Sequence, residues 1–241
     1  MTQAPNLSDE PDGRTATVAT QLMAHAAALG LDLRTDQVEQ LLRYLELLQR
    51  WNKVYNLTAV RDPQQMLGQH LLDCLAAAPS LARAVEGASR LPSDEASPQI
   101  LDVGSGAGLP GAVLAILYPH WTVCCVDAVA KKIAFLTNVA GTLSLPNLRP
   151  VHARVQDLKQ RDFRLITCRA FASLPDFTAW TRDHLAATGQ WAAMKGHLPT
   201  DEIANLDPSI EVFHVEPLKV PTLNAARCIV WMRPRDRQTA P

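Results

Sequence analysis

The chain has 241 residues, of which 47% are apolar, and it carries 23 basic against 24 acidic side chains. This length and apolar content are enough for one large domain with a substantial core. The near balance of charge argues against a protein that is basic over its whole surface, although a local basic face can exist within a neutral total. No apolar run approaches the roughly 20 residues that a membrane helix needs.

Residues 1–17 are polar, include Pro5 and Pro11, and lack the apolar core of a secretory signal. We expect a disordered tail there and a cytoplasmic protein. The five cysteines form no C-x-x-C pair and no zinc-like spacing with histidine, so we expect buried, reduced thiols and no metal site. Cys124 and Cys125 lie in a strand-like run and should point to its opposite faces.

The first third of the chain has apolar residues every three to four positions, a pattern that predicts helices. One helix is expected over 18–29. A second should begin with Thr35 as its N-cap residue. A third should begin with Asp62 as its N-cap residue and Pro63 in its first turn, and should end at Pro79.

From residue 99 on, short apolar runs alternate with helical stretches. This rhythm predicts βαβ units and a mainly parallel sheet flanked by helices, which is an α/β fold. Strands are expected at 99–103, 121–126, 148–152, 163–168, 189–194, 210–216 and 226–232, with helices near 110–118, 129–143 and 174–186. The last two strands are joined by a short link without a helix, so they could pair antiparallel at the end of the sheet.

The domain organisation follows from these patterns. Residues 86–98 are polar and contain Pro, Ser and Gly, which predicts a linker. The expected parts are a tail at 1–17, a helical extension with its linker at 18–98, the main domain at 99–233 and a basic tail at 234–241.

The first expected strand of the main domain ends in a glycine-rich turn. Gly104, Gly106 and Gly108 stand at alternate positions after it. Without Cβ atoms, such a turn lets a ligand lie directly on the backbone, and the amides at the start of the next helix face that ligand. Because ligands of doubly wound sheets bind at the carboxyl ends of the strands, the turn predicts a site for a nucleotide-type cofactor.

Two cofactors have to be compared for this turn. The dinucleotide fingerprint G-x-G-x-x-G, counted from Gly104, would need glycine where the chain has Leu109. An acid followed by G-x-G-x-G, here Asp102 to Gly108, resembles instead the first motif of class I S-adenosylmethionine-dependent methyltransferases. Asp127 ends the next strand 19 residues past Gly108, where a carboxylate can accept the ribose hydroxyls of either cofactor. An NAD-type oxidoreductase therefore remains the rival.

Motifs outside the turn narrow the comparison. In chain order they are Trp-Asn-Lys-Val-Tyr-Asn-Leu-Thr at 51–58, His-Leu-Leu-Asp at 70–73, the glycine turn with its Leu-Pro-Gly extension, Val-Asp at 126–127 with Lys-Lys at 131–132, Cys-Arg-Ala-Phe-Ala at 168–172 and Lys-Gly at 195–196. Their order and spacing resemble the RsmG (GidB) family of bacterial ribosomal RNA methyltransferases over residues 20–232.

The resemblance implies a class I methyltransferase fold and transfer of a methyl group from S-adenosylmethionine to N7 of a guanine in the decoding-region loop of 16S ribosomal RNA. Together with the glycine motif and the second acid, it gives a set of cofactor-binding residues: Gly104, Gly106, Gly108, Leu109, Asp127, Val155, Gln156 and Arg169. The position of Gln156 commonly holds Glu in this family. The amide can still accept a hydrogen bond there, but an ionic role is lost.

We expect no general acid or base. Guanine N7 has a lone pair in the ring plane and no proton, so its methylation needs neither a base nor a covalent intermediate. The chain accordingly lacks the Asn/Asp-Pro-Pro-aromatic motif of amine methyltransferases after the fourth strand. Orientation alone can supply on the order of 7–11 kcal/mol. Arg169 is the candidate positioning residue and could face either the guanine or the cofactor carboxylate.

Several polar residues are candidates for the substrate side of the site: Asn52, Asn56, Thr58, His70 and Lys195. The alternative is that the first three only build turns, that His70 is packed and that Lys195 is solvated. Basic side chains could contact RNA phosphates; they are Lys131, Lys132, Arg149, Arg154, Lys159, Arg161, Arg164, Arg233, Arg235 and Arg237. Methylation of another base or of a small molecule, and a non-enzymatic binding module, remain alternatives.

Overall fold

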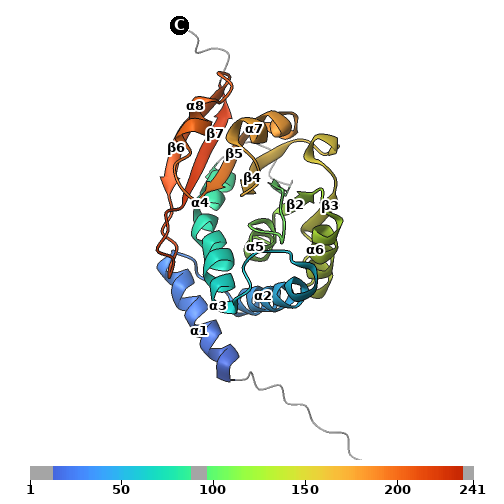
Figure 1. Cartoon of the computed structure of the whole chain (residues 1–241), viewed down its shortest axis with the longest axis vertical. Helices are drawn as coiled ribbons and strands as arrows, with labels where there is room; N and C mark the ends of the chain where they lie inside the picture. Colours follow the sequence, from blue (N-terminus) through green and yellow to red (C-terminus); the bar gives the residue numbers. More distant parts are fainter. Residues whose placement is uncertain (1–12, 88–96, 236–241) are drawn as a thin grey trace, which may run out of the picture.

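The computed structural model describes residues 13–87 and 97–235. Its strands are β1 (Gln99–Val103), β2 (Thr122–Asp127), β3 (Leu148–His152), β4 (Phe163–Arg169), β5 (Leu185–Lys195), β6 (Ile210–Pro217) and β7 (Cys228–Pro234). They form one seven-stranded sheet in the order β3-β2-β1-β4-β5-β7-β6 (Figure 1). Strands β1 to β5 pair in parallel, and β7 runs antiparallel between β5 and β6. The α/β class, every expected strand and the antiparallel end of the sheet are thus confirmed.

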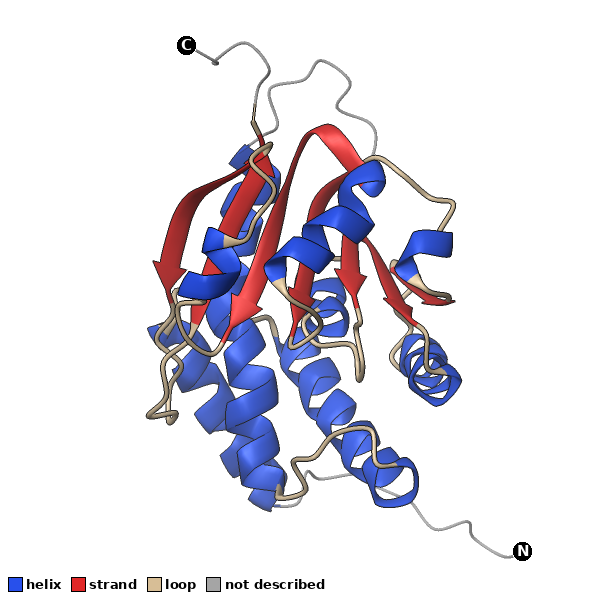
Figure 2. Ribbon diagram, turned by 45° about the horizontal axis from the view of Figure 1, so that its top comes forward, coloured by secondary structure: helices blue, strands red, loops and turns tan. Residues whose placement is uncertain are grey.

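Helices cover both faces of this sheet (Figure 2). In chain order the helical elements are α1 (Gly13–Ala28), α2 (Thr35–Tyr55), α3 (Pro63–Met66), the π-helical segment η1 (Leu67–Leu72), α4 (Asp73–Gly87), α5 (Gly111–Leu117), α6 (Ala130–Thr142), the 3₁₀ turn η2 (Val155–Asp157), α7 (Leu174–Thr181), the 3₁₀ turn η3 (Arg182–His184) and α8 (Thr200–Ala204). The sequence patterns did not predict α8, which is too short to show a helical period.

Three predicted boundaries are wrong. Helix α1 begins at Gly13, so residues 13–17, expected in the tail, are helical. Helix α4 passes through Pro79 and ends at Gly87. The helix expected over 174–186 is shorter, because Leu185 already pairs with Phe163 of β4 and strand pairing overrides the helical pattern. The rest of the tail, most of the linker and the end of the basic tail, residues 1–12, 88–96 and 236–241, lie outside the described residues.

The caps of the N-terminal helices are partly as predicted. Arg34, and not Thr35, is the N-cap residue of α2, and its backbone N–H donates to Oε1 of Gln37 (3.1 Å). Asp62 caps α3 as expected, since its Oδ1 accepts the N–H of Gln65 at 2.8 Å. These caps fix where α2 begins and where α3 begins after the loop that follows α2.

The sheet has a hydrophobic cluster on each face. Cys124 belongs to one cluster and Cys125 to the other, which confirms their opposite orientation, and all five cysteines are buried and free. Leu41 of α2 and Leu71 of η1 are fully buried in the same cluster as Ile100 of β1. The N-terminal helices therefore share a core with the sheet, and the domain boundary at residue 98 stays a prediction. None of the described helices is long and apolar enough to cross a membrane.

Candidate functional site

The turn after β1 has the backbone conformation that its glycines allow. Gly104, Gly106 and Gly108 have φ values of +64°, +58° and +85°. A Cβ atom on Gly104 would overlap the ring of Phe171, whereas one on Gly106 would meet nothing nearer than the carbonyl oxygen of Gly104 at 3.9 Å. The first glycine is thus needed for space as well as for conformation, and the second for conformation alone.

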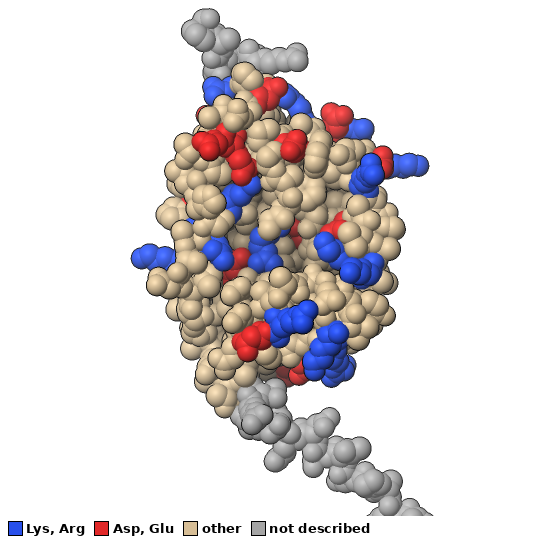
Figure 3. Space-filling view, in the orientation of Figure 1, with Lys and Arg blue, Asp and Glu red and all other residues tan. Residues whose placement is uncertain are grey.

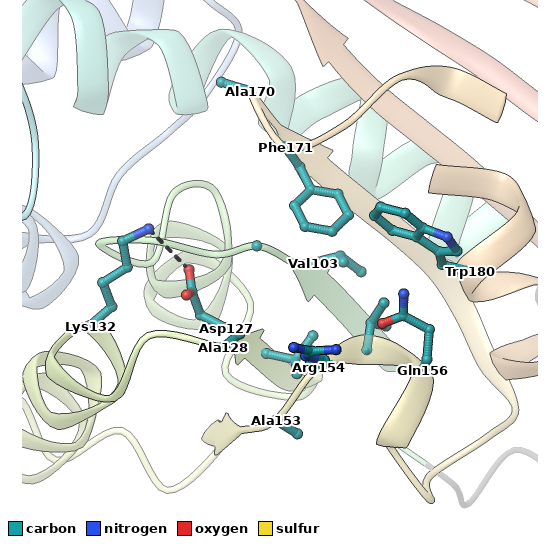
Figure 4. Close-up of a pocket in the computed structure, with 13 residues that line it drawn as sticks. Val103, Asp127, Ala128, Lys132, Ala153, Arg154, Gln156, Ala170, Phe171 and Trp180 are labelled. Carbon is teal, nitrogen blue, oxygen red and sulfur yellow. Dashed lines mark hydrogen bonds and ion pairs between the residues drawn. The ribbon is translucent and has the colours of Figure 1, made fainter. Parts of the chain in front are cut away.

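A cleft of about 540 Å³ lies beside this turn, at the carboxyl ends of β1, β2, β3 and β4 (Figure 4). Its lining residues are Val103, Gly104, Val126, Asp127, Ala128, Lys132, Ala153, Arg154, Val155, Gln156, Ala170, Phe171 and Trp180. Of the predicted cofactor residues, this set contains Gly104, Asp127, Val155 and Gln156. Gly106, Gly108, Leu109 and Arg169 lie outside it, and Leu109 is buried in the core.

Two aromatic rings form one wall of the cleft. Ala170 has a φ of +50°, in the left-handed region, directly after β4, and Phe171 follows it against Gly104. The rings of Phe171 and Trp180 meet edge to face with centroids 5.9 Å apart, a preferred aromatic geometry. Trp180 is 38% exposed, which is unusual for so large an apolar side chain. The wall faces Gln156 and Arg154 across the cleft (Figure 4).

Asp127 ties the turn to the second strand. Its Oδ2 accepts the backbone N–H of Gly106 (3.0 Å) and lies 3.3 Å from Nζ of Lys132, and its Oδ1 accepts the N–H of Val129 (2.9 Å). The carboxylate therefore sets the shape of the glycine turn while it lines the cleft.

Asp102 lies beneath the turn and not in the cleft. It is fully buried, and its Oδ2 accepts the N–H of Gly111 at 2.8 Å, at the start of α5. Its Oδ1 has no hydrogen-bond partner among the described residues. Burial raises the pKa of this carboxyl to about 7, because loss of water disfavours the charged form. The acid of the motif thus supports the turn from below.

Arg169 points away from the cleft, towards the N-terminal helices. Its Nη1 donates to Oδ2 of Asp73 (3.0 Å) and to the carbonyl oxygen of Gln69 (2.9 Å). Nε of Arg227 donates to Oδ1 of the same carboxylate at 3.1 Å. Asp73 is 3% exposed, and the two arginine side chains are 21% and 23% exposed. Two guanidinium groups therefore share one buried carboxylate at the carboxyl end of β4.

His70 extends this network to the loop after α2. Its Nε2 lies 2.8 Å from Oγ1 of Thr58, and its Nδ1 lies 3.5 Å from Nη2 of Arg169. Burial and, second, the charge of Arg169 lower the pKa of His70 to about 4. The imidazole is therefore neutral near pH 7, and the position is a packed, hydrogen-bonded histidine within η1.

Replacement of His70 should change how stability depends on pH. The pKa of this imidazole is near 6.5 in the unfolded chain and about 4 in the folded one. The stability from neutral His70 is complete above pH 6.5 and is lost as the pH falls towards 4, by about 3 kcal/mol. Urea unfolding should show this loss in the parent protein and not in His70→Gln. Asp102, whose pKa is raised, adds stability as the pH falls, but it does so equally in both proteins and cancels in the comparison. Equal pH profiles of the two proteins would contradict the lowered pKa of His70.

Asn52 and Asn56 build the loop that follows α2. The side-chain amide of Asn52 donates to the carbonyl oxygen of Val60 (3.0 Å), and its Oδ1 accepts the N–H of Thr58 (2.8 Å). Asn56 ends α2 in the left-handed region, with a φ of +47°. With Arg61, both asparagines line a second hollow of about 370 Å³. Asn52 thus builds the turn after α2, which is the alternative to a role in substrate binding.

Lys195 has a protein partner. Its Nζ lies 2.8 Å from Oε2 of Glu202 and donates to the carbonyl oxygen of Ala172 at 3.1 Å. Glu202 also accepts the backbone N–H of Leu174, the first residue of α7. Lys195 therefore fixes the segment between β4 and α7, next to the aromatic wall of the cleft.

The basic side chains named as possible contacts for RNA phosphates do not form one cluster. Arg154 lines the cleft at the carboxyl edge of the sheet. Arg161 and Arg164 lie at the start of β4, where they donate to the carbonyl oxygens of Asp183 and Val85. Arg233 pairs with Glu211 on the neighbouring strand β6. Arg237 lies outside the described residues. No group of three or more potential metal ligands was found among the residues described.

Comparison with known proteins adds to this geometry. Residues 37–230 match the model of the family GidB, rRNA small subunit methyltransferase G. A protein of Paracidovorax citrulli is 58% identical over 90% of both chains, and one of Bordetella avium is 47% identical over 89% of this chain and 93% of its own; each is called ribosomal RNA small subunit methyltransferase G.

Solved structures resemble the fold. TrmN of Thermus thermophilus has a TM-score of 0.52 at 17% identity and covers 70% of this chain and 53% of its own. A SAM-dependent methyltransferase of Aquifex aeolicus has a TM-score of 0.51 at 16% identity, with 71% and 93% covered. At this identity the likeness concerns the fold alone, which is that of class I methyltransferases.

Proposed function

Because the chain belongs to the rRNA small subunit methyltransferase G (GidB) family, we propose that it methylates 16S ribosomal RNA with S-adenosylmethionine as the methyl donor. The acceptor is N7 of a guanine in the decoding-region loop, on the RNA or on the small ribosomal subunit, in the cytoplasm. The observation that carries the proposal is the cleft that joins the glycine turn, Asp127 and an aromatic wall at the carboxyl ends of the central strands.

The residues of the cleft suit this cofactor. A volume of about 540 Å³ lies in the range of small-molecule sites. Gly104 would hold the amino acid part, Asp127 the ribose, and Val155 and Gln156 the adenine, with Phe171 beside them. When bound, the cofactor supplies a methyl group activated by a sulfonium. In this proposal Gly106, Gly108 and Leu109 shape the turn.

The chain's own contribution to the reaction is orientation. Guanine N7 needs no base, and the carboxylate of the cleft is already engaged, since Asp127 accepts the N–H groups of Gly106 and Val129 and pairs with Lys132. Arg169 is a positioning residue, held by Asp73 at the end of β4. Phe171, two residues further on, lies against Gly104, where an added Cβ atom would overlap its ring. This arrangement holds the acceptor base against the cofactor and leaves proton transfer out of the reaction.

Trp180→Ala should weaken the binding of S-adenosylmethionine about 5- to 30-fold, because the loss of an aromatic contact costs ~1–2 kcal/mol. Trp180→Phe keeps an aromatic ring there and should bind within about threefold of the parent protein. Isothermal calorimetry with the three proteins measures the difference. Equal affinities for all three would place Trp180 outside the cofactor site.

The proposed activity is tested on small ribosomal subunits from cells that lack the gene. Incubation with the purified protein and S-adenosylmethionine should add one methyl group, and nucleotide mass mapping should place it on N7 of one guanine of the 16S RNA. Methylation of another base would overturn the acceptor assignment. Calorimetric binding of NAD, with none of S-adenosylmethionine, would favour the oxidoreductase instead.

A further inference from the structure

A surface beside the cleft combines an exposed aromatic ring with exposed cations. It lies where α2 ends and α6 begins, and we call it the docking patch: Lys53, Tyr55, Arg61 and Lys131. Tyr55 is 45% exposed, and its neighbour Val54 is 69% exposed. Figure 3 shows Lys and Arg side chains around the hollow of this face, including the side where α2 and α6 lie.

The ring of Tyr55 is held by other rings. It lies 5.1 Å from the ring of Trp51, which in turn meets the ring of Phe135 at 5.6 Å. Phe135 is fully buried in α6. The exposed ring of Tyr55 is therefore the outer end of an aromatic row anchored in the core. Because this side chain is already held in place, a ligand that binds it loses little free energy in ordering it.

The cations of the docking patch have no acidic partners within residues 13–87 and 97–235. Nζ of Lys131 donates to the carbonyl oxygen of Tyr55 (2.8 Å), and Nη2 of Arg61 donates to Oδ1 of Asn56 (3.3 Å). No salt bridge joins Lys53, Arg61 or Lys131 to a carboxylate in this part of the chain. Their positive charge is thus available to an anionic partner.

The docking patch adjoins the reaction site. Lys131 precedes Lys132, which lines the cleft and pairs with Asp127. The docking patch and the cleft thus meet at the start of α6. Exposed cations around a rigid aromatic ring are the composition of surfaces that bind single-stranded nucleic acid, in which phosphates meet the cations and an unpaired base stacks on the ring.

We propose that the docking patch binds unpaired RNA next to the methylated guanine, with a neighbouring base stacked on Tyr55 and the backbone phosphates against Lys53, Arg61 and Lys131. The proposal rests on the proposed function, since it concerns how that substrate is held. It separates the two tasks of the enzyme, because the cleft takes the cofactor while the end of α2 recognises a loop in the RNA.

The first test is Tyr55→Ala, assayed on unmodified small subunits and on a labelled RNA hairpin whose loop has the target sequence. The variant should raise KM for the RNA roughly 5- to 100-fold, and Tyr55→Phe should restore it. Phe213→Ala is the matched control, since Phe213 is also an exposed ring, 39% accessible, with the guanidinium of Arg233 over it, but lies on β6. Calorimetry with S-adenosylmethionine should give the same affinity for all variants.

A second test uses salt and does not depend on Tyr55. Lys53→Gln should reduce the slope of log affinity for the hairpin against log salt concentration by about 0.7–1. Arg182→Gln is the control; Arg182 is an exposed cation in η3, before the amino end of β5, and it donates to Oγ of Ser209. That variant should keep the slope of the parent protein.

The outcomes separate the two proposals. If the parent protein does not methylate ribosomal RNA, the proposed function fails. If it does, and both Tyr55→Ala and Lys53→Gln behave like their controls, the docking patch is not the RNA site. A loss confined to intact subunits, with unchanged binding of the hairpin, would show a protein partner at the patch and would equally overturn the proposal.

Discussion

Gly104→Ala should reduce the affinity for S-adenosylmethionine at least about 30-fold. The residue has a φ of +64°, and a Cβ atom there would overlap the Phe171 ring. The left-handed conformation costs Ala about 1–2 kcal/mol and the overlap about 1–3 kcal/mol more. Either the turn or the aromatic wall must move, and both define the cleft. Calorimetric titration of the purified variant measures the loss.

Substitutions at two other glycines separate the cost of the left-handed conformation from the cost of the steric overlap. Gly106 has a similar φ of +58° but an open surrounding, so Gly106→Ala should show only the conformational cost of about 1–2 kcal/mol. Gly141 lies in α6 with nothing within 4 Å of an added Cβ. Gly141→Ala should be neutral or stabilising by up to about 1 kcal/mol. If Gly104→Ala bound S-adenosylmethionine as tightly as the parent protein does, the cofactor would not bind between the glycine turn and Phe171.

Asp73→Asn should lower the free energy of unfolding by about 3 kcal/mol or more. The substitution leaves Arg169 and Arg227 without their shared counter-ion, and removal of one member of a buried ion pair typically costs 3–5 kcal/mol. This is a large part of the 5–15 kcal/mol that stabilises a typical domain. Activity should fall as well, because Arg169 precedes the segment that carries Phe171. Urea unfolding followed by circular dichroism gives the stability.

The matched control for this prediction is Asp36→Asn. Asp36 pairs with Arg34 at 2.8 Å, but the two side chains are 61% and 57% exposed. Exposed ion pairs contribute little to the free energy of unfolding, so this variant should unfold close to the parent protein. If both variants lost the same small amount, the Asp73 carboxylate would not be the centre of a buried network.

The sequence predicted the parts of the fold that depend on local pattern. Seven strands and the turn at Gly104 are visible because β-strands and glycine turns have their signals within a few residues. The placement of Asp127 beside the turn follows from a general rule for parallel sheets, in which the carboxyl ends of neighbouring strands meet. These elements were sufficient to locate the cleft.

Partners from distant parts of the chain could not be predicted in this way. Nothing near Arg169 indicates that it pairs with Asp73, and nothing near Lys195 indicates that it meets Glu202 rather than a phosphate. Trp180 lies on a helix whose pattern suggests only packing, yet it lines the cleft. Such contacts depend on how helices pack on the sheet, which a single sequence does not encode at fixed spacings.

The Asp73 network also bears on how the chain is made. Arg169 follows Asp73 by 96 residues and Arg227 follows it by 154. At 5–20 residues per second, Arg227 is synthesised roughly 8–30 s after Asp73. Until then the carboxylate lacks one guanidinium partner, and β7 has not entered its place between β5 and β6. The nascent chain therefore cannot complete this network before residue 227 has been translated.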